Sequence, residues 1–455
     1  MSGPRVRISL GFGFALLALG ALSTACTSER ESSPASKPRT TETLASTQPM
    51  NLVMIGLDTL RADHVGLYGY ERPTTPNLDR FAEASVVFER TYSQASSTRP
   101  SHQSMFQSRP PSAAAANYLA LAEVLFENGF RTAAFTGGGN ISSRLGFARG
   151  FERYEERDTG LAGTLPMAAA WLREHRDERF FLFLHTYDIH LPYDPPEPYA
   201  SMFSENYEGV VTGAETRSLL RRVRELDGFE GKSFDLETND RERVVALYDG
   251  GIRYADNQLA HLFRLAEELD LYRDTVFVFF SDHGEEFWDH GTTIHSHSLY
   301  QEQLHVPLIL RTPKHDSKRI ADRVPLMDLS PTLLELLSLP VPSAFEGKSL
   351  VGLIDGSDTG DRIAIAEQRA LKSWFEYPWK FIRSTDTGRV ELYDLEKDPL
   401  EQNNVADAHP DIAIKLSDRL NARLAEGSGD AVPELEPGIV DPEHLKRLRA
   451  LGYIE

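Results

Sequence analysis

Three short apolar runs, each followed at once by a polar residue, constrain the fold of this chain more than any other feature. They are Met50 to Leu57 before Asp58, Phe180 to Leu184 before His185, and Thr275 to Phe280 before Ser281-Asp282-His283. A continuous apolar run of this length is typical of a strand buried on both faces of a parallel sheet. The carboxyl ends of parallel strands meet at one edge of the sheet, where ligands bind. We therefore expect these polar segments to converge on one site.

Segments with a helical period alternate with these runs. Helices are expected at residues 76–84, 101–106, 118–128, 166–175, 239–269 and 329–337, and further strands at 131–135 and 307–310. This alternation predicts an α/β fold with a mostly parallel central sheet flanked by helices on both faces. A β-hairpin at 379–383 and 390–395 and a helix at 410–424 are expected beyond it. Residues 49–360 are thus predicted to form the main domain, and residues 361–455 a small C-terminal α+β subdomain.

The N-terminus is typical of an export signal. Two arginines precede an apolar stretch, residues 9–22, that is too short to span a membrane comfortably. Cys26, the single cysteine of the chain, follows a small-residue cleavage site and resembles the cysteine of a bacterial lipoprotein signal. We expect residues 1–25 to be removed, Cys26 to anchor the protein in the periplasm or cell envelope, and residues 26–48 to form a flexible tether. The alternative is an ordinary signal peptide with an incidental cysteine.

The formal net charge of the chain is −20. Binding nucleic acid requires clustered Lys and Arg side chains that neutralise phosphates, so nucleic acid is not expected as a partner. The acidity is expected to serve solubility instead.

Carboxylate and imidazole donors follow two of the expected strands. Asp58, Asp282 and His283 suit a divalent cation such as Zn²⁺ or Mn²⁺. Thr98 lies just before an expected helix, whose exposed N–H groups favour tetrahedral anions. A threonine hydroxyl becomes an effective nucleophile only when a base or a metal activates it. The alternative for Asp58 is an ordinary turn or capping residue, and for Thr98 an N-cap.

Several segments together resemble the sulfatase branch of the alkaline phosphatase superfamily. The resemblance covers essentially Met50 to Glu455 and rests on Asn51 to Tyr70, Thr98 to Ser108, Phe183 to Pro192, Ser281 to Pro307, Tyr393 to Val405 and Arg447 to Tyr453. It implies the fold of that family and a divalent metal, Zn²⁺, Mn²⁺ or Ca²⁺, as the cofactor.

The resemblance also implies roles for individual residues. Metal ligands would be Asp58, Thr98, Asp282 and His283. Thr98, His190 and His297 would be catalytic, with the two histidines contacting the substrate oxyanion and one of them assisting the leaving group. His102, His185 and His295 would bind substrate. The alternative for His185 and His295 is an ordinary structural role, and any second metal would need ligands from among His185, His190, His295 and His297.

Departures from the family pattern bear on the chemistry. Thr98 stands where sulfatases have a cysteine, or sometimes a serine, that they oxidise to formylglycine, so no formylglycine is expected. Thr59 replaces the second of two paired aspartates, and His102 replaces an arginine. Phosphoethanolamine transferases, lipoteichoic acid synthases and nucleotide pyrophosphatases use a threonine nucleophile, and the ligand set of this chain resembles theirs.

These observations predict a metal-dependent hydrolase or transferase of sulfate or phosphate esters, with Thr98 as the metal-activated nucleophile. The substrate would be a sulfated or phosphorylated glycan, lipid or small molecule. An inactive protein of the same fold that binds anionic glycans or lipids is the alternative, and sulfatase activity with Thr98 acting directly is a third reading. Ser204 to Thr238 is expected to form a lid or insertion near the site.

Overall fold

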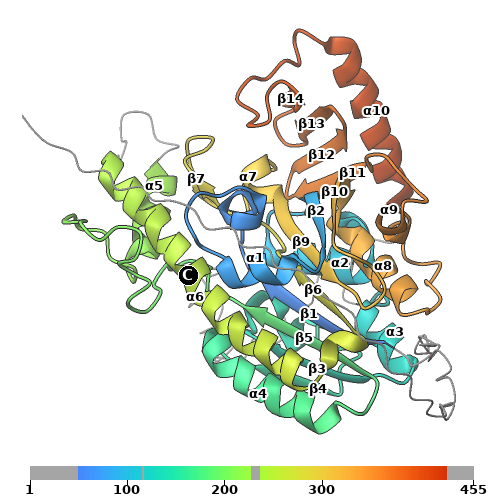
Figure 1. Cartoon of the computed structure of the whole chain (residues 1–455). Helices are drawn as coiled ribbons and strands as arrows, with labels where there is room; N and C mark the ends of the chain where they lie inside the picture. Colours follow the sequence, from blue (N-terminus) through green and yellow to red (C-terminus); the bar gives the residue numbers. More distant parts are fainter. Residues whose placement is uncertain (1–49, 115–116, 227–235, 428–455) are drawn as a thin grey trace, which may run out of the picture. The chain divides into compact units, whose positions relative to one another are not determined.

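An eight-stranded sheet forms the centre of the protein in the computed structural model (Figure 1). The structure describes residues 50–114, 117–226 and 236–427, which belong to one compact unit. The predictions for residues 1–48, including the anchor at Cys26, and the segment Arg447 to Tyr453 lie outside the described residues. None of the helices that the structure describes is long and apolar enough to cross a membrane.

The central sheet is mostly parallel, as predicted. Its strand order is β10-β2-β9-β6-β1-β5-β3-β4, and β9 alone runs antiparallel to its neighbours β2 and β6. The strands are β1 (Asn51–Leu57), β2 (Val86–Tyr92), β3 (Arg131–Thr136), β4 (Arg153–Glu156), β5 (Phe180–Thr186), β6 (Thr275–Phe280), β9 (His305–Arg311) and β10 (Lys318–Pro325). The predicted α/β class is confirmed.

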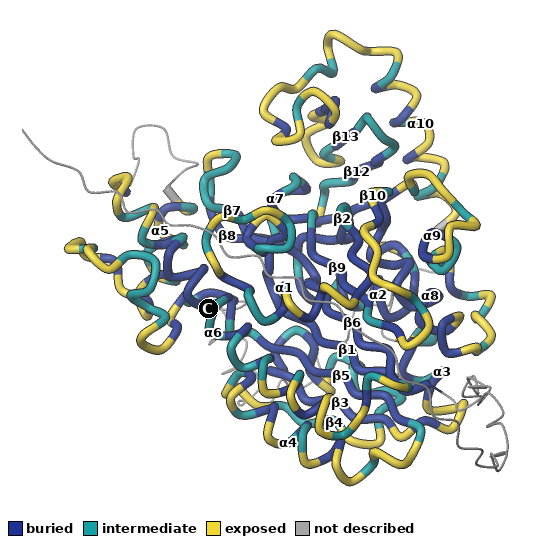
Figure 2. Tube along the Cα trace, viewed as in Figure 1, coloured by how far each residue is buried: buried dark blue, intermediate teal, exposed yellow. Residues whose placement is uncertain are grey.

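Helices cover both faces of this sheet (Figure 1). One face packs against α1 (Pro76–Ala82), α4 (Gly160–His175) and α6 (Thr238–Glu268), and the other against α2 (Thr98–Gln107), α3 (Leu121–Glu127) and α8 (Leu329–Leu336). Alternate residues of β1 enter the two cores, because successive side chains of a strand point to opposite faces. Figure 2 shows that the central strands are buried, as their continuous apolar sequence predicts.

The helix expected at residues 166–175 begins earlier, at Gly160. Pro166 lies inside this helix although proline lacks the N–H of a helical hydrogen bond. The helix continues through Pro166 because its apolar face, including Leu161, Leu165 and Trp171, is buried in the core. Tertiary packing therefore outweighs the local cost of proline.

Short elements surround the edge of the sheet where the site forms. The insertion at 204–238 contains α5 (Thr216–Leu226), and the segment after β6 contains β7 (Glu286–Phe287), β8 (Thr293–Ile294) and α7 (Gln301–Leu304). α9 (Val351–Asp355) follows α8.

The C-terminal subdomain is a four-stranded antiparallel sheet with one long helix. Its elements are β11 (Ala364–Gln368), β12 (Leu371–Glu376), β13 (Trp379–Ser384), β14 (Val390–Asp394) and α10 (Pro410–Gly427). The expected hairpin is the β13–β14 pair, and two further strands complete the sheet. One face of this sheet shares a core with Tyr92, Leu299 and Leu304 of the main domain, and the other packs on α10.

Candidate active site

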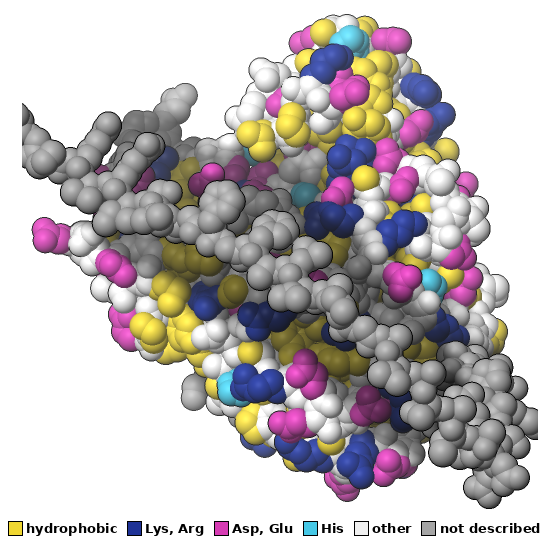
Figure 3. All heavy atoms as spheres, viewed as in Figure 1, with side chains coloured by type: hydrophobic (Ala, Val, Ile, Leu, Met, Phe, Trp, Pro, Cys, Tyr) yellow, Lys and Arg dark blue, Asp and Glu magenta, His cyan; other side chains and the backbone are white. Residues whose placement is uncertain are grey.

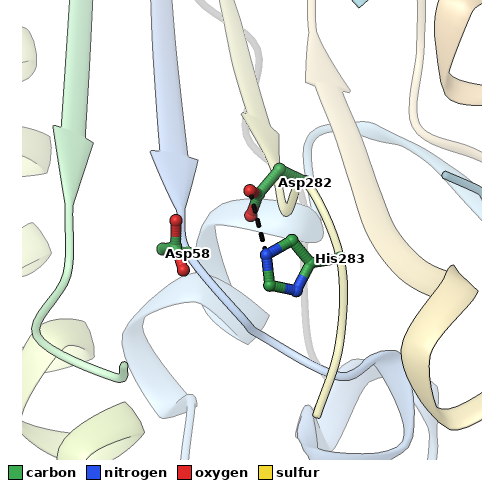
Figure 4. A group of neighbouring side chains, drawn as sticks. All are labelled: Asp58, Asp282 and His283. Atoms are coloured by element: carbon green, nitrogen blue, oxygen red, sulfur yellow. Dashed lines mark ion pairs between the residues drawn. The ribbon is translucent and has the colours of Figure 1, made fainter. Parts of the chain in front are cut away.

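Asp58, Asp282 and His283 form a buried cluster at the carboxyl edge of the sheet (Figure 4). β1 lies between β5 and β6, and its Gly56 is in register with His185 on one side and Phe280 on the other. The residues that follow β1 and β6 therefore leave the sheet side by side. One ligand atom from each of the three cluster residues lies within 4.8 Å of the others.

Thr98 joins this cluster from the start of α2. Its hydroxyl Oγ1 lies 3.2 Å from His283 Nε2. The Nδ1 of His283 lies 2.9 Å from the carbonyl oxygen of Gly284. A carbonyl only accepts hydrogen bonds, so Nδ1 carries the ring proton and the Nε2 lone pair faces Thr98. The N-cap position of α2 belongs to Ser97, so Thr98 is the first residue of the helix and not its cap.

The electrostatics of the cluster favour a bound cation. All four carboxylate oxygens of Asp58 and Asp282 are buried. None of them receives a well-aligned hydrogen bond from the described residues. Burial, reinforced by the Asp282 carboxylate, raises the pKa of Asp58 well above its usual range. Burial alone would also raise the pKa of Asp282, but the neighbouring His283 and His102 hold it well below that range. Two adjacent buried carboxylates of this kind require a proton or a cation between them.

A divalent cation fits these residues. Donors about 2.0–2.6 Å from a Zn²⁺ or Ca²⁺ ion lie within about 5 Å of one another, as the three donors here do. An ion held by one oxygen of each carboxylate and by the Nε2 lone pair of His283 would satisfy polar atoms that are otherwise buried without a hydrogen-bond partner. The cluster is therefore a candidate metal site whose metal the donor types leave open between Zn²⁺, Mn²⁺ and Ca²⁺.

His102 and His185 lie on the sheet side of this cluster. The Nδ1 of His102 donates to the carbonyl of Thr98 at 2.9 Å and is 3.4 Å from Asp282 Oδ2. His185 Nε2 is 3.4 Å from Asp58 Oδ2, and the centroids of the two imidazole rings are 5.0 Å apart. Burial, with the nearby His102, lowers the pKa of His185 well below its usual range. Both histidines contact the candidate metal ligands, and their predicted role in substrate binding stays a prediction.

His190 and His295 form a second pair of rings, on the other side of His283. Their centroids are 5.1 Å apart, and that of His295 is 4.5 Å from His283. The Nδ1 of His190 donates to Leu191 O at 2.8 Å. Burial, with the nearby His295, lowers the pKa of His190 to about 3, so its imidazole is neutral near pH 7. Burial, with the nearby His283, likewise lowers the pKa of His295. The catalytic and substrate-binding roles of these residues stay predictions.

His297 points elsewhere. Its Nδ1 lies 3.2 Å from the carbonyl oxygen of His295, and its Nε2 lies 2.8 Å from Glu286 Oε2. Both ring nitrogens thus face acceptors outside the cluster of Asp58, Asp282 and His283. The predicted catalytic role of His297 stays a prediction. In that role, its Nε2 would first have to separate from Glu286.

Several residues at the site had no predicted role. Glu285 Oε1 lies 2.9 Å from His295 Nδ1 and so orients that ring. The hydroxyl of Ser281 accepts from Leu60 N–H at 2.9 Å and donates to His283 O at 2.8 Å, which joins the two ligand loops. Gln368 reaches the site from β11. The only sequence signal for Glu285 and Ser281 is that they flank Asp282-His283, and Gln368 has no local signal.

Curated proteins with similar sequences include arylsulfatases. The chain is 26% identical to mouse (Mus musculus) arylsulfatase K over 204 residues, which covers 40% of the chain and 36% of that protein. It is 27% identical to an arylsulfatase of Clostridium perfringens over 246 residues, which covers 51% of the chain and 50% of that protein. The chain thus spans half or less of the length of these two relatives.

Solved structures share the fold at low sequence identity. A phosphonate monoester hydrolase of Agrobacterium radiobacter superposes with a TM-score of 0.70 at 20% identity, covering 87% of the chain and 98% of that protein. The protein BT4656, solved with its substrate D-glucosamine-2-N,6-O-disulfate, superposes with a TM-score of 0.71 at 16% identity, covering 85% of the chain and 100% of that protein.

Two family models match the chain. Residues 290–427 match the model of the C-terminal region of N-sulphoglucosamine sulphohydrolase. Residues 50–339, which include the candidate metal ligands and every histidine named above, match the sulfatase model. With the fold, the ligand cluster and this match in agreement, the chain belongs to the sulfatase family.

Proposed function

We propose that the protein is a metal-dependent hydrolase of sulfate or phosphate esters in which Thr98 is the nucleophile. The observation that carries this proposal is the position of the Thr98 hydroxyl, 3.2 Å from His283 Nε2 and beside two buried carboxylates. Relatives in this family with a cysteine-derived formylglycine use a different nucleophile, and Thr98 replaces it with an unmodified hydroxyl.

The chain's own residues support attack by this hydroxyl. The Thr98 hydroxyl lies 3.2 Å from His283 Nε2, and the backbone of α2 fixes its position at the first turn of the helix. Oγ1 releases its proton to solvent and bonds to the phosphorus or sulfur atom while the bond from that atom to the leaving-group oxygen breaks. The leaving oxygen takes up a proton, and water then hydrolyses the covalent adduct and restores the Thr98 hydroxyl. A divalent cation held by Asp58, Asp282 and His283 would lower the pKa of the hydroxyl and offset negative charge on the ester oxygens.

The leaving-group oxygen needs a proton or a hydrogen-bond donor on the side opposite to Thr98. His190 and His295, whose ring centroids are 5.1 Å apart, lie beyond His283. Because each ring donates its Nδ1 proton to a neighbouring oxygen, it would donate to the leaving group only after its Nε2 takes up a proton. We propose that these two rings, and not His297, contact the substrate oxyanion and the leaving group. The reason is that His297 Nε2 is already paired with Glu286. A sulfated or phosphorylated glycan is the favoured substrate, since BT4656 binds a disulfated glucosamine.

The test compares Thr98→Ala and Thr98→Ser with the wild-type protein, loaded with Zn²⁺ or Mn²⁺. Turnover is measured on sulfate monoesters, phosphate monoesters, phosphonate monoesters and phosphodiesters that release a chromophore. We expect Thr98→Ala to lower kcat by roughly 10³-fold or more, since a nucleophile that forms the adduct cannot be bypassed. Thr98→Ser should retain measurable turnover.

Ser104→Ala is the matched control, because Ser104 is another buried hydroxyl of α2 and bonds to the carbonyl of Arg109. It should leave turnover near the wild-type value. Intact-mass analysis of wild-type protein during slow turnover should show one added phosphoryl or sulfuryl group, and Thr98→Ala should show none. Equal turnover by Thr98→Ala and wild type would exclude the covalent route. Absence of bound metal together with absence of turnover on every ester would favour an inactive binding protein.

A further inference from the structure

The helix α5 presents a row of arginines beside the site. Arg217, Arg221 and Arg224 recur at spacings of four and three residues, so they share one face of the helix. Leu220 and Val223 on the adjoining face are buried and hold the helix in place. The three arginine side chains are half-buried.

This arginine face lies against the two loops that carry His190 and His295. Arg224 Nη1 donates to the carbonyl of His295 at 3.2 Å, and Arg217 Nη2 donates to the carbonyl of Leu191 at 2.5 Å. The Thr293 hydroxyl also donates to the carbonyl of Leu220 at 3.3 Å, which joins α5 to β8. The α5 arginines therefore border the site, on the side of the second histidine pair.

A fourth arginine approaches from the C-terminal subdomain. Gln368, the last residue of β11, donates to the carbonyl of Ser296 at 3.3 Å and accepts from the Ser97 hydroxyl at 2.9 Å. Its contacts hold the β11–β12 turn between the nucleophile segment and the histidine loop. Arg369 follows in this turn, exposed to solvent, with a φ of 50° that is uncommon for a residue with a long side chain. The turn thus delivers a guanidinium to the border of the site.

Arg224 and Arg369 have no carboxylate partner among the residues that the structure describes. Neither forms an ion pair with a carboxylate in residues 50–114, 117–226 and 236–427. Burial and then the nearby Arg369 lower the pKa of Arg224, while Glu285 and Glu286, which would favour its charge, are paired with His295 and His297.

Elsewhere arginines stand next to acids, as Arg319 does beside Glu89, and Figure 3 shows basic and acidic side chains interspersed on one face. In a chain of net charge −20, two neighbouring arginines that pair with no described carboxylate can bind an anion from outside the protein.

We infer that Arg224 and Arg369, with Arg221 beside them, bind a second anionic group of the substrate, next to the ester that Thr98 would cleave. We call these three residues the arginine rim. A guanidinium binds sulfate, phosphate or carboxylate oxygens through two parallel hydrogen bonds, which suits this task. The substrate class is therefore an ester that carries at least two anionic groups, such as a multiply sulfated glycan. This inference rests on the proposed function for the position of the cleaved ester.

The test measures the affinity of the metal-loaded protein for glycans that differ in their number of sulfates. The series is D-glucosamine 6-O-sulfate, D-glucosamine-2-N,6-O-disulfate and a fully sulfated heparin disaccharide, each titrated by calorimetry into the Thr98→Ala protein at constant ionic strength. We expect the Kd to fall by about tenfold or more from the first ligand to the last, since charge-assisted hydrogen bonds are added. Arg224→Gln or Arg369→Gln should remove most of this difference.

Arg222→Gln is the matched control, because Arg222 lies on the same helix but is exposed on another face. It removes the same charge and should keep the preference for the most sulfated ligand. The proposed arginine rim would be wrong if Arg222→Gln and Arg224→Gln reduced the preference for the most sulfated ligand equally. It would also be wrong if the parent protein showed no such preference. Turnover on the chromogenic esters is measured separately. Tighter binding of the more sulfated ligands without turnover would reject only the proposed hydrolase function. Turnover without this difference in affinity would reject only the proposed role of the arginine rim.

Discussion

Two adjacent acids, Glu285 and Glu286, orient two different histidines of the site. Glu285 Oε1 is 2.9 Å from His295 Nδ1, and Glu286 Oε2 is 2.8 Å from His297 Nε2. A carboxylate that accepts from one ring nitrogen fixes the orientation and the tautomer of the imidazole. The His295 ring contacts His283, whereas the His297 ring is directed away from the ligand cluster. At the scale of single residues, Glu285 is therefore the acid whose histidine lies next to the candidate metal ligands.

We expect Glu285→Gln to reduce kcat by roughly 10–100-fold, the usual effect of removing a partner that orients a site residue. Glu286→Gln should have a smaller effect on kcat because its histidine lies farther from the cluster. Both variants are measured on the same ester, with thermal midpoints recorded to detect misfolding. A larger loss in Glu286→Gln than in Glu285→Gln, at equal thermal stability, would return the leaving-group role to His297.

At the scale of elements, the site depends on how the loops after β1 and β6 are joined. The Ser281 hydroxyl links Leu60 of the first loop to His283 of the second. The Tyr248 hydroxyl of α6 donates to the carbonyl of Thr59 at 2.7 Å and accepts from the N–H of Arg61 at 3.0 Å. These bonds hold Thr59 at a φ of 60°, in the left-handed region. Asp58 is thereby kept in position beside Asp282.

Ser281→Ala is expected to weaken metal binding by about tenfold, because both ligand loops lose a shared hydrogen bond and their donors become less well ordered. The measurement is competition for Zn²⁺ against a chelator of known affinity. Ser330→Ala serves as the control, since Ser330 is also buried and donates to the carbonyl of Met105, away from the ligand loops. Equal metal affinity in Ser281→Ala and wild type would show that the loops hold their geometry without this hydroxyl.

At the scale of the whole molecule, the main domain and the C-terminal subdomain share a core. Tyr92, Leu299 and Leu304 pack against residues of the small sheet such as Ile382. The ammonium of Lys380 and the carboxylate of Glu401, both buried and 2.7 Å apart, pair within the subdomain. Gln368 connects it to the active-site loops. Neither part can lose its structure without exposing apolar surface of the other.

We therefore expect residues 50–427 to unfold in one cooperative transition. Trp374 and Trp379 report on the subdomain, and Trp171 and Trp288 on the main domain. Urea unfolding is followed by tryptophan fluorescence and by far-UV circular dichroism in Trp171→Phe/Trp288→Phe and in Trp374→Phe/Trp379→Phe. The two signals should coincide within each variant. Separate midpoints for the two tryptophan pairs would show that the subdomain folds independently.

Local sequence was sufficient for the strands whose burial is continuous. Thr275 to Phe280 has the bounds expected of it, and β1, β5 and the long helix α6 differ from expectation by at most two residues at either end. Such runs are apolar at every position because both faces of the sheet are covered. By contrast, β2 and β10 were not expected: their sequences, VVFERTY and KRIADRVP, include charged residues. They are strands because β10 pairs with β2 and β2 pairs with β9. Local sequence patterns do not predict such pairing between distant segments.

The sequence by itself therefore determined the α/β class, the central strands, and the polar residues that follow them, because periodicity and strand ends are local properties. Only the tertiary structure decided which of those residues meet. Thr98 and His283 are 185 positions apart and become neighbours because α2 begins where β2 ends, at the same edge as β6. The same holds for Arg224 and Arg369, which come from an insertion and a separate subdomain. Contacts between distant segments depend on strand order and register, and these are set by the packing of the whole sheet.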